Sequence, residues 1–204
     1  MLESARSTEV RRNIARSKSV NIGVVVLVIL IVSVILGFVA DIAWSAIEKT
    51  VYPKPDEYAG FVEKYSKKFA VPEEIIWAVI KTESNFDASA VSGKGAVGLM
   101  QLMEPTFEEI SNVRLKEGLP VGMRYDPETS IRYGTYYLAY LYERYKDWDT
   151  AIAAYNAGLG KVDRWMGDDG KLTIDEIPWD HLETTGYLIK VNIRAEGYKK
   201  LYAS

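Results

Sequence analysis

Two neighbouring stretches, IIWAVIKTESNF at Ile75–Phe86 and GAVGLMQLMEPT at Gly95–Thr106, decide the fold of this chain. The first predicts a helix in which apolar side chains three, four and seven positions before Glu83 share its face. The C-terminal end of a helix is partially negative, and apolar neighbours disfavour an ionised group. We therefore expect the pKa of Glu83 to be raised. A glutamate near a helix end can equally be a solvated surface residue, so the neighbouring motifs must decide.

Composition bounds the possible chemistry. The chain has 204 residues, enough for one domain with an appendage, and a formal net charge of −3, so no broad basic surface favours nucleic acid as a partner. It contains no cysteine, which excludes disulfides, thiolate zinc sites and a cysteine nucleophile. His181 is the only histidine, so a site with several histidine ligands is impossible. We expect neither a metal nor a cofactor.

An apolar run from Val20 to Ala40 predicts a transmembrane helix, because it has the ~20 residues that a bilayer requires and no charge interrupts it. The residues before it are mostly basic, and acidic residues follow it, so the positive-inside rule places the N-terminus in the cytoplasm. The charged residues before the run are Arg6, Arg11, Arg12, Arg16, Lys18, Glu3 and Glu9, and those after it include Asp41 and Glu48.

Two alternatives to an anchor stay open. A cleavable signal peptide usually has a shorter apolar region of ~7–15 residues, and bulky Phe38 and Trp44 disfavour cleavage after Ala40 or Ala46. A buried helix of a soluble protein does not explain the charge asymmetry. The sequence thus predicts a cytoplasmic basic tail (1–19), a transmembrane anchor (20–40), a juxtamembrane connector (41–57) and an extracytoplasmic domain (58–204) on the cell membrane.

The domain beyond the connector is predicted to be all-α, since no stretch alternates over enough residues to form a strand. Asp126 and Pro127 form a strong helix start, Asp149 is predicted to cap the next helix, and Gly158 and Gly160 are predicted to stop it. The expected helices cover residues 56–69, 72–83, 105–111, 127–146, 150–156 and 182–201.

Four local signals then occur in order. Glu83-Ser84 ends its helix, Ser92 lies nine residues on, Gly98-Leu99-Met100-Gln101 follows, and Ala154-Tyr155-Asn156-Ala157-Gly158 comes later. This set, from about Ala59 to Tyr198, resembles the catalytic domain of the soluble lytic transglycosylases, which are related to goose-type lysozyme. The resemblance implies a lysozyme-like helical domain acting on peptidoglycan. In one departure, Pro105 stands one position later than in the family pattern.

The resemblance also implies roles for individual residues. Glu83 matches the family's single catalytic acid/base, and a protonated carboxylic acid is what glycosidic cleavage requires. The residues that match groups lining the substrate cleft are Ser92, Gln101, Met103, Tyr155, Asn156, Glu183 and Tyr187, with Met100 in the same apolar wall. Tyr155 could also orient Glu83 through its hydroxyl. Structural readings remain for several: Ser92 as a turn cap, Met100 and Met103 as core, Asn156 as a helix end and Glu183 as a helix cap.

The implied reaction is intramolecular. Glu83 would protonate the oxygen between N-acetylmuramic acid and N-acetylglucosamine, then accept the proton of the C6 hydroxyl, giving a 1,6-anhydro end. Such a reaction needs no second carboxylate to activate water. A hydrolase using Asp87, Asp126 or Asp175 as a base, and an inactive wall-binding scaffold, are the alternatives. The expected partners are glycan strands, the membrane and possible envelope-spanning machinery.

Overall fold

The structure is a computed structural model that describes residues 22–167 and 170–202. The predicted basic tail (1–19) and the first two residues of the predicted span, Val20 and Asn21, lie outside the described residues. The chain divides into two units, residues 1–51 and residues 52–204.

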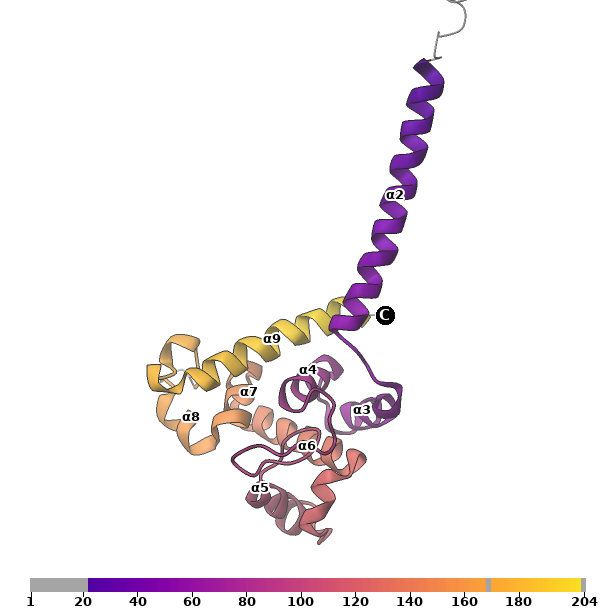
Figure 1. The fold of residues 1–204 in the computed structure, drawn as a ribbon. Helices are drawn as coiled ribbons and strands as arrows, with labels where there is room; N and C mark the ends of the chain where they lie inside the picture. Colours follow the sequence, from indigo (N-terminus) through magenta and orange to yellow (C-terminus); the bar gives the residue numbers. More distant parts are fainter. Residues whose placement is uncertain (1–21, 168–169, 203–204) are drawn as a thin grey trace, which may run out of the picture. The chain divides into compact units, whose positions relative to one another are not determined.

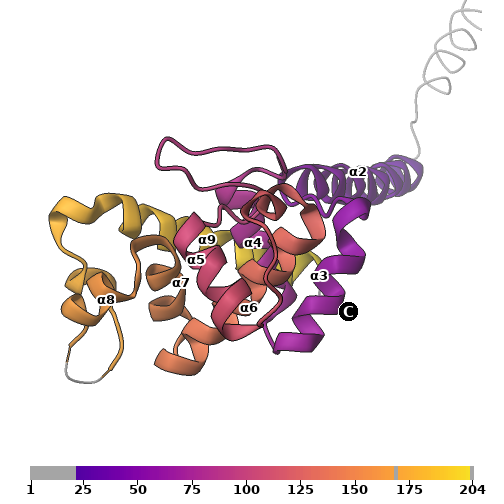
Figure 2. The same cartoon turned by 90° about the horizontal axis from the view of Figure 1, so that it is seen from below.

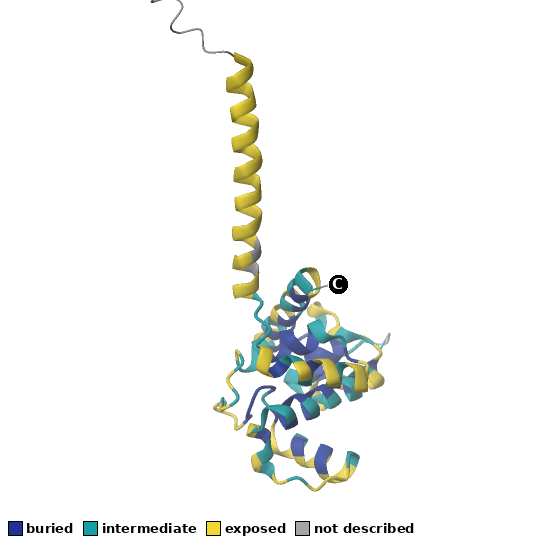
Figure 3. Ribbon diagram, turned by 90° about the vertical axis from the view of Figure 1, so that its right-hand side faces the viewer, coloured by how far each residue is buried: buried dark blue, intermediate teal, exposed yellow. Residues whose placement is uncertain are grey.

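In the first unit, α2 (Ile22–Val51) is a helix of 30 residues that is long and apolar enough to cross a membrane. Its described side chains are exposed along its whole length (Figure 3). The helix continues eleven residues past Ala40, so most of the predicted connector is helical. Neither glycine nor proline occurs between Phe38 and Pro53, and a single charged residue such as Asp41 does not stop a helix.

The second unit is helical, as expected, and no strand occurs among the described residues, where only the isolated bridges Val91–Val97 and Val97–Leu102 are found. Its α-helices are α3 (Asp56–Phe69), α4 (Glu73–Glu83), α5 (Glu104–Glu108), α6 (Pro127–Tyr145), α7 (Trp148–Ala157), α8 (Leu159–Trp165) and α9 (Leu182–Tyr202). Short segments of other helix types are η1 (Glu109–Arg114, a π-helix) and the 3-10 helices η2 (Val121–Tyr125), η3 (Ile174–Glu176) and η4 (Trp179–His181).

Helix α4 is central to this unit and packs against α9 and α3, while α6 packs against α3 and α7, and α7 packs against α9 (Figures 1 and 2). Six consecutive residues of α4, from Ile75 to Ile80, are buried. A helix that is apolar on every side is buried on every side. The helix that carries Glu83 at its C-terminal end is therefore anchored in the core.

The start of α7 differs from the prediction that Asp149 caps it. The cap is Asp147, whose carboxylate accepts hydrogen bonds from the Thr150 backbone N–H (2.9 Å) and the Thr150 hydroxyl (2.7 Å). Asp149 lies in the first turn, where its carboxylate accepts a hydrogen bond from Asn192. Both aspartates are suitable helix caps. Because Trp148 is tolerated as the first helical residue, the cap lies at Asp147, two positions earlier than predicted.

The end of α7 matches the prediction, but Gly160 does not act as a second stop. Gly158 ends α7 with a positive φ of 88°. Its carbonyl oxygen then accepts the backbone N–H groups of Lys161 and Val162, which begins α8. Gly160 lies inside α8, a helix that the sequence did not predict, because two glycines two residues apart resemble a loop.

The chain enters the second unit at Tyr52, earlier than the predicted boundary at 57/58. A side chain at Gly197 of α9 would overlap the Tyr52 ring, so these two residues are in close contact. The hydroxyls of Tyr198 and Tyr202 donate hydrogen bonds to the carbonyl oxygens of Pro53 (2.8 Å) and Tyr52 (2.9 Å). The last part of the predicted connector is therefore fixed to the C-terminal half of α9.

Candidate active site

A cavity of about 630 Å³ opens on the second unit beside the end of α4. Its walls come from the end of α4, the loop between α4 and α5, the end of α7, and the starts of α8 and α9. The lining residues are Glu83, Ser92, Gly93, Lys94, Ala96, Gln101, Met103, Tyr155, Asn156, Ala157, Lys161 and Glu183. Six of the seven residues predicted to bind substrate thus line one cavity together with Glu83, and Tyr187 is the exception.

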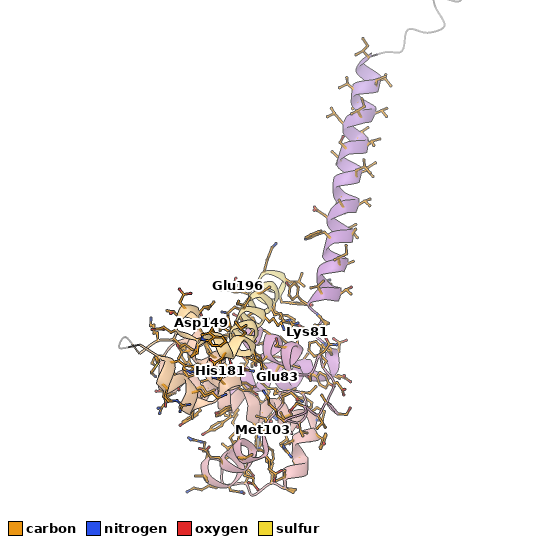
Figure 4. The ribbon with its side chains drawn as sticks, turned by 60° about the vertical axis from the view of Figure 1, so that its left-hand side comes forward. Lys81, Glu83, Met103, Asp149, His181 and Glu196 are labelled. Atoms are coloured by element: carbon orange, nitrogen blue, oxygen red, sulfur yellow. The ribbon has the colours of Figure 1, made fainter. Side chains whose placement is uncertain are left out.

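Glu83 is the last residue of α4 and has one carboxyl oxygen engaged inside the protein. The Tyr187 hydroxyl donates to its Oε1 at 2.7 Å. Burial raises the pKa of Glu83 to about 7, the hydrogen bond from Tyr187 opposes that rise, and the charge of Glu183 adds to it. The bond to Oε1 leaves Oε2 available to carry the proton. Figure 4 shows Glu83 within the body of the domain.

The tyrosine that contacts Glu83 is Tyr187, whereas the sequence pointed to Tyr155. The Tyr155 hydroxyl donates instead to the backbone carbonyl of Met100 at 2.7 Å. Its ring lines the cavity, and burial raises its pKa well above the ordinary value. Tyr155 therefore holds the Met100 backbone in place and leaves the orientation of Glu83 to Tyr187.

The glycine-rich loop is fixed by backbone contacts that only glycine allows. Gly98 has a φ of +81°, and a Cβ there would overlap the carbonyl oxygen of Arg124. The buried Arg124 guanidinium donates to the carbonyls of Gly95 and Leu102, both at 3.2 Å. Ser84 closes the other side by donating to the Leu99 carbonyl at 2.9 Å. The loop is thereby tied to the end of α4.

Gln101 presents an acceptor to the cavity. Its side-chain amide nitrogen donates to the backbone carbonyls of Ala90 (3.0 Å) and Gly98 (2.9 Å). These two acceptors fix which end of the amide is nitrogen, because the opposite orientation would place oxygen against oxygen. The side-chain oxygen of Gln101 is left to meet a hydroxyl or an amide N–H of a ligand.

Ser92 caps a turn and also lines the cavity. Its oxygen accepts the backbone N–H groups of Ala96 (3.0 Å) and Lys94 (3.3 Å), so its hydroxyl hydrogen stays available. Met103 is 40% exposed and forms part of the wall, while Met100 is fully buried against Gly134. The expected apolar wall therefore consists of Met103, and Met100 belongs to the core.

The far wall combines Asn156 and the start of α9. The Thr184 hydroxyl donates to Oδ1 of Asn156 at 2.9 Å, which leaves the amide nitrogen free to face the cavity. Glu183, in the first turn of α9, forms an exposed ion pair with Lys94 of the opposite loop at 2.9 Å. An exposed pair of this kind contributes little to stability.

Sequence reasoning missed Lys94, Lys161 and Arg124. The two lysines line the cavity, and their only sequence signal is that each lies directly beside a glycine, Lys94 between Gly93 and Gly95 and Lys161 after Gly160. Arg124 gave no signal, because its two partners in the glycine-rich loop, Gly95 and Leu102, lie more than twenty residues away in the chain. Asp87, Asp126 and Asp175 do not line the cavity, so the aspartates considered as a second catalytic carboxylate are not placed there.

Within residues 22–167 and 170–202 there is no group of three or more histidine, aspartate or glutamate side chains that could hold a metal ion. His181 contacts the Trp165 ring, with 4.7 Å between ring centroids, and lies outside the cavity lining. The chemistry that these groups support is proton transfer by one carboxyl of raised pKa, surrounded by donors and acceptors suited to sugar hydroxyls.

The helical architecture and an acid of raised pKa, Glu83, that lines the cavity define a lysozyme-like domain. The model of the transglycosylase SLT domain family matches residues 60–178, and the chain belongs to this family.

Relatives with known names agree with this assignment. The chain is 34% identical over 168 residues to the membrane-bound lytic murein transglycosylase C of Serratia proteamaculans, a match that covers 71% of this chain and 47% of that protein. It is 31% identical over 160 residues to the soluble lytic murein transglycosylase of Escherichia coli K12, covering 75% of this chain and 24% of that one. The chain thus spans half or less of the length of these relatives.

Solved structures show the same likeness. The structure of the 70-kDa soluble lytic transglycosylase of Escherichia coli matches with a TM-score of 0.67 and 30% identity, over 75% of this chain and 25% of that one. The same enzyme solved in complex with bulgecin A gives a TM-score of 0.69. The structure of an inactive mutant of the lytic transglycosylase Slt from Pseudomonas aeruginosa matches with a TM-score of 0.64 and 31% identity, over 76% of this chain.

Proposed function

We propose that this chain is a peptidoglycan lytic transglycosylase in which Glu83 acts first as an acid and then as a base. The observation that supports this most is the combination of a pKa of about 7 with a fixed orientation at the cavity. A carboxyl with that pKa is half protonated near neutral pH, so it can donate a proton in one step and accept one in the next.

The proposed reaction balances without water. Glu83 gives its proton to the oxygen that bridges N-acetylmuramic acid and N-acetylglucosamine, and the bond from C1 to that oxygen breaks. The C6 hydroxyl of the muramic acid residue then bonds to C1 as ionised Glu83 takes its proton. The products are a free hydroxyl on one sugar and a 1,6-anhydro ring on the other. The only catalytic carboxyl that this sequence of steps requires is Glu83.

A lysozyme-like hydrolase remains the second candidate, and Glu183 is the observation in its favour. It is the other carboxylate among the described residues that line the cavity, and a hydrolase uses a second carboxylate to activate water. Its ion pair with Lys94 and its exposed position favour substrate contact over that role.

Mass spectrometry of digested peptidoglycan tests the reaction. Transglycosylation predicts anhydro ends, whereas reducing ends one water heavier would show hydrolysis. Glu83→Gln should lower the rate of wall cleavage by roughly 10²–10⁴-fold, because the acid is lost while the shape is kept. Glu74→Gln changes the same residue type at the other end of α4 and should leave the rate unchanged. Full activity of the Glu83→Gln protein would reject the assignment.

Binding of bulgecin A is a further test of family-like recognition. The 70-kDa soluble enzyme has been solved in complex with bulgecin A. If the cavity described above binds the same ligand, bulgecin A should inhibit wall cleavage and raise the melting temperature of the full chain by mass action. Absence of both effects, with active protein, would show that this cavity differs from that of the relative.

We also place the chain in the cell membrane, with α2 as a single span and the second unit outside. Support comes from the apolar length of α2, the basic residues that precede it and the membrane-bound relative. Its substrate would be glycan strands near the membrane. Recruitment by wall-building or envelope-spanning machinery would follow from that position.

A further inference from the structure

Helix α9 carries apolar side chains on two opposite faces. The inward face is buried against α4 and α7 and includes Leu188, Val191 and Ala195. On the outward face, Leu182 is 70% exposed, Ile189 42% and Ile193 61%. A surface helix normally keeps one apolar stripe, facing the core. The domain core therefore does not account for the outward stripe, which lies on the helix along one edge of the domain (Figure 1).

Gly186 completes the outward stripe. The order Leu182, Gly186, Ile189, Ile193 has the 4-3-4 spacing of a seam along which one helix packs against another. The fold does not require glycine here, because a Cβ at Gly186 would meet no atom within 4 Å. A glycine inside a helix lowers its stability, so the residue calls for another reason. It leaves a hollow between two large apolar side chains.

We propose that the outward stripe of α9 pairs with the same stripe of a second copy of this chain, with the two helices antiparallel. In that register Leu182 packs against Ile193 of the second copy, and Ile189 enters the hollow at Gly186 of the second copy. The stripe is self-complementary, because each large side chain meets a small or apolar one. In a parallel pair, the hollow at Gly186 of one copy would lie opposite the hollow at Gly186 of the other copy.

The flanks of the stripe agree with the antiparallel register. Glu183 and Lys190 are both exposed beside the stripe, and the antiparallel register brings Glu183, which also pairs with Lys94 of its own chain, near Lys190 of the other copy. Opposite charges across such a seam favour one orientation over another. Trp179, 85% exposed in η4, lies three residues before Leu182 in the chain.

The size of the stripe indicates a weak pair. One exposed helix face buries less than the ~800 Å² per partner of a standard stable complex. Two copies held in one membrane meet at a much higher effective concentration than two copies in solution. The extent of pairing in cells therefore depends on the proposed anchor. The contact between the two α9 helices does not itself involve that anchor. A lipid surface is the other occupant to consider, but it requires neither the 4-3-4 spacing nor the hollow at Gly186.

Thiol cross-linking tests the orientation, because the chain contains no cysteine. Leu182→Cys and Ile193→Cys are made separately in the full chain and expressed in membranes, singly and together. Antiparallel pairing predicts a disulfide-linked dimer when the two variants are mixed. Each variant alone should give at least ~5-fold less dimer, since the two copies of one residue would lie about 16 Å apart along the helices. Mixing Ile193→Cys with Lys68→Cys, on exposed α3, is the control.

Several outcomes would overturn the proposal. Equal cross-linking of the single variants would show parallel pairing or random collision. Absence of a dimer from the mixture, while both thiols react with an aqueous maleimide, would show an unpaired face. If membranes protect the thiols from the maleimide and no dimer forms, lipid covers the stripe. Wall cleavage by each variant is measured separately, so loss of the proposed enzymatic function would not be confused with loss of pairing.

Substitutions at two separate glycines, Gly186 and Gly60, provide an independent test of the hollow. Gly186→Leu fills the hollow, so it should lower the yield of the 182–193 cross-link at least ~5-fold while raising the melting temperature, because the monomer has open space there. Gly60→Leu is the matched control, since Gly60 of α3 also meets nothing within 4 Å. It should stabilise the chain without changing the cross-link. An unchanged yield for Gly186→Leu would reject the proposed seam.

Discussion

Glu83 combines the properties that proton transfer requires with a cost to stability. Burial keeps its proton to about pH 7, while a glutamate in the unfolded chain loses its proton near pH 4.5. Between these values the folded state binds more protons than the unfolded state. The free energy of unfolding therefore falls as pH rises through this range. The contribution of Glu83 to that free energy is lowest above pH 7. An acid held at this position thus destabilises the fold at neutral pH.

The stability of Glu83→Gln should show this cost. Because glutamine is neutral at every pH and its carbonyl can still accept the Tyr187 hydroxyl, the variant should be more stable than the natural chain at pH 8 by about 1–3 kcal/mol. Near pH 4 the difference should vanish, since both side chains are then neutral. Denaturant unfolding at the two pH values measures it. A variant that is less stable at pH 8 would contradict the burial of the carboxyl.

Tyr187 is expected to set the pH range of activity as well as the orientation of Glu83. Its hydrogen bond favours the ionised carboxylate, so Tyr187→Phe should raise the pKa of Glu83 above about 7. The alkaline limb of the rate of wall cleavage should then move to higher pH, and the maximal rate should fall about tenfold as orientation is lost.

Tyr155→Phe is the matched control for that prediction. Its hydroxyl donates to the Met100 carbonyl and not to Glu83, so the alkaline limb should stay near its natural position even if the rate falls. A shift with Tyr155→Phe and none with Tyr187→Phe would reverse the roles of the two tyrosines.

At the scale of elements, α4 was predictable because its signals are local. Its apolar periodicity, Pro72 before its start and the glutamates in its first turn lie within a dozen residues of one another. The observed bounds, Glu73–Glu83, agree with the expectation, and Glu83 ends the helix. The start of α7 was less certain, because Asp147 and Asp149 carry the same local signal and only the tertiary setting of Trp148 separates them.

Alanine substitutions at these two aspartates test the corrected cap of α7. Asp147→Ala removes the acceptor for the Thr150 backbone N–H and should destabilise the domain by about 1 kcal/mol. Asp149→Ala removes an exposed hydrogen bond with Asn192 and should cost less than about 0.5 kcal/mol. Thermal unfolding compares the two variants. A larger effect for Asp149→Ala would restore the original prediction.

At the scale of the whole molecule, contacts between distant segments escaped the sequence. The hydrogen bond between Tyr187 and Glu83 joins residues 104 positions apart, and Tyr202 reaches back 150 positions to Tyr52. Local patterns carry no information on such pairs. Six of the seven residues predicted to bind substrate line one cavity with Glu83, but the tyrosine that contacts Glu83 is Tyr187 and not Tyr155. Arg124 was missed for the same reason.

The continuation of α2 to Val51 changes the expected structure of the segment between the proposed span and the second unit. Residues beyond Ala40 add about 16 Å of helix at 1.5 Å per residue, where the sequence predicted a juxtamembrane connector (41–57). If residues 20–40 fill the hydrocarbon layer, this extension crosses the headgroup region. The second unit follows directly in the chain, from Tyr52 onward.

Thiol labelling of intact cells tests the predicted topology. Ser7→Cys places a unique thiol before the span, and Lys68→Cys places one on α3, since the natural chain has none. With the N-terminus cytoplasmic, a membrane-impermeant maleimide should label the second variant and not the first until the cells are opened. Carbonate extraction should leave both variants in the membrane if the helix is retained. Release of a shorter, soluble chain would instead identify α2 as part of a cleaved signal peptide, and labelling of Ser7→Cys in intact cells would reverse the orientation.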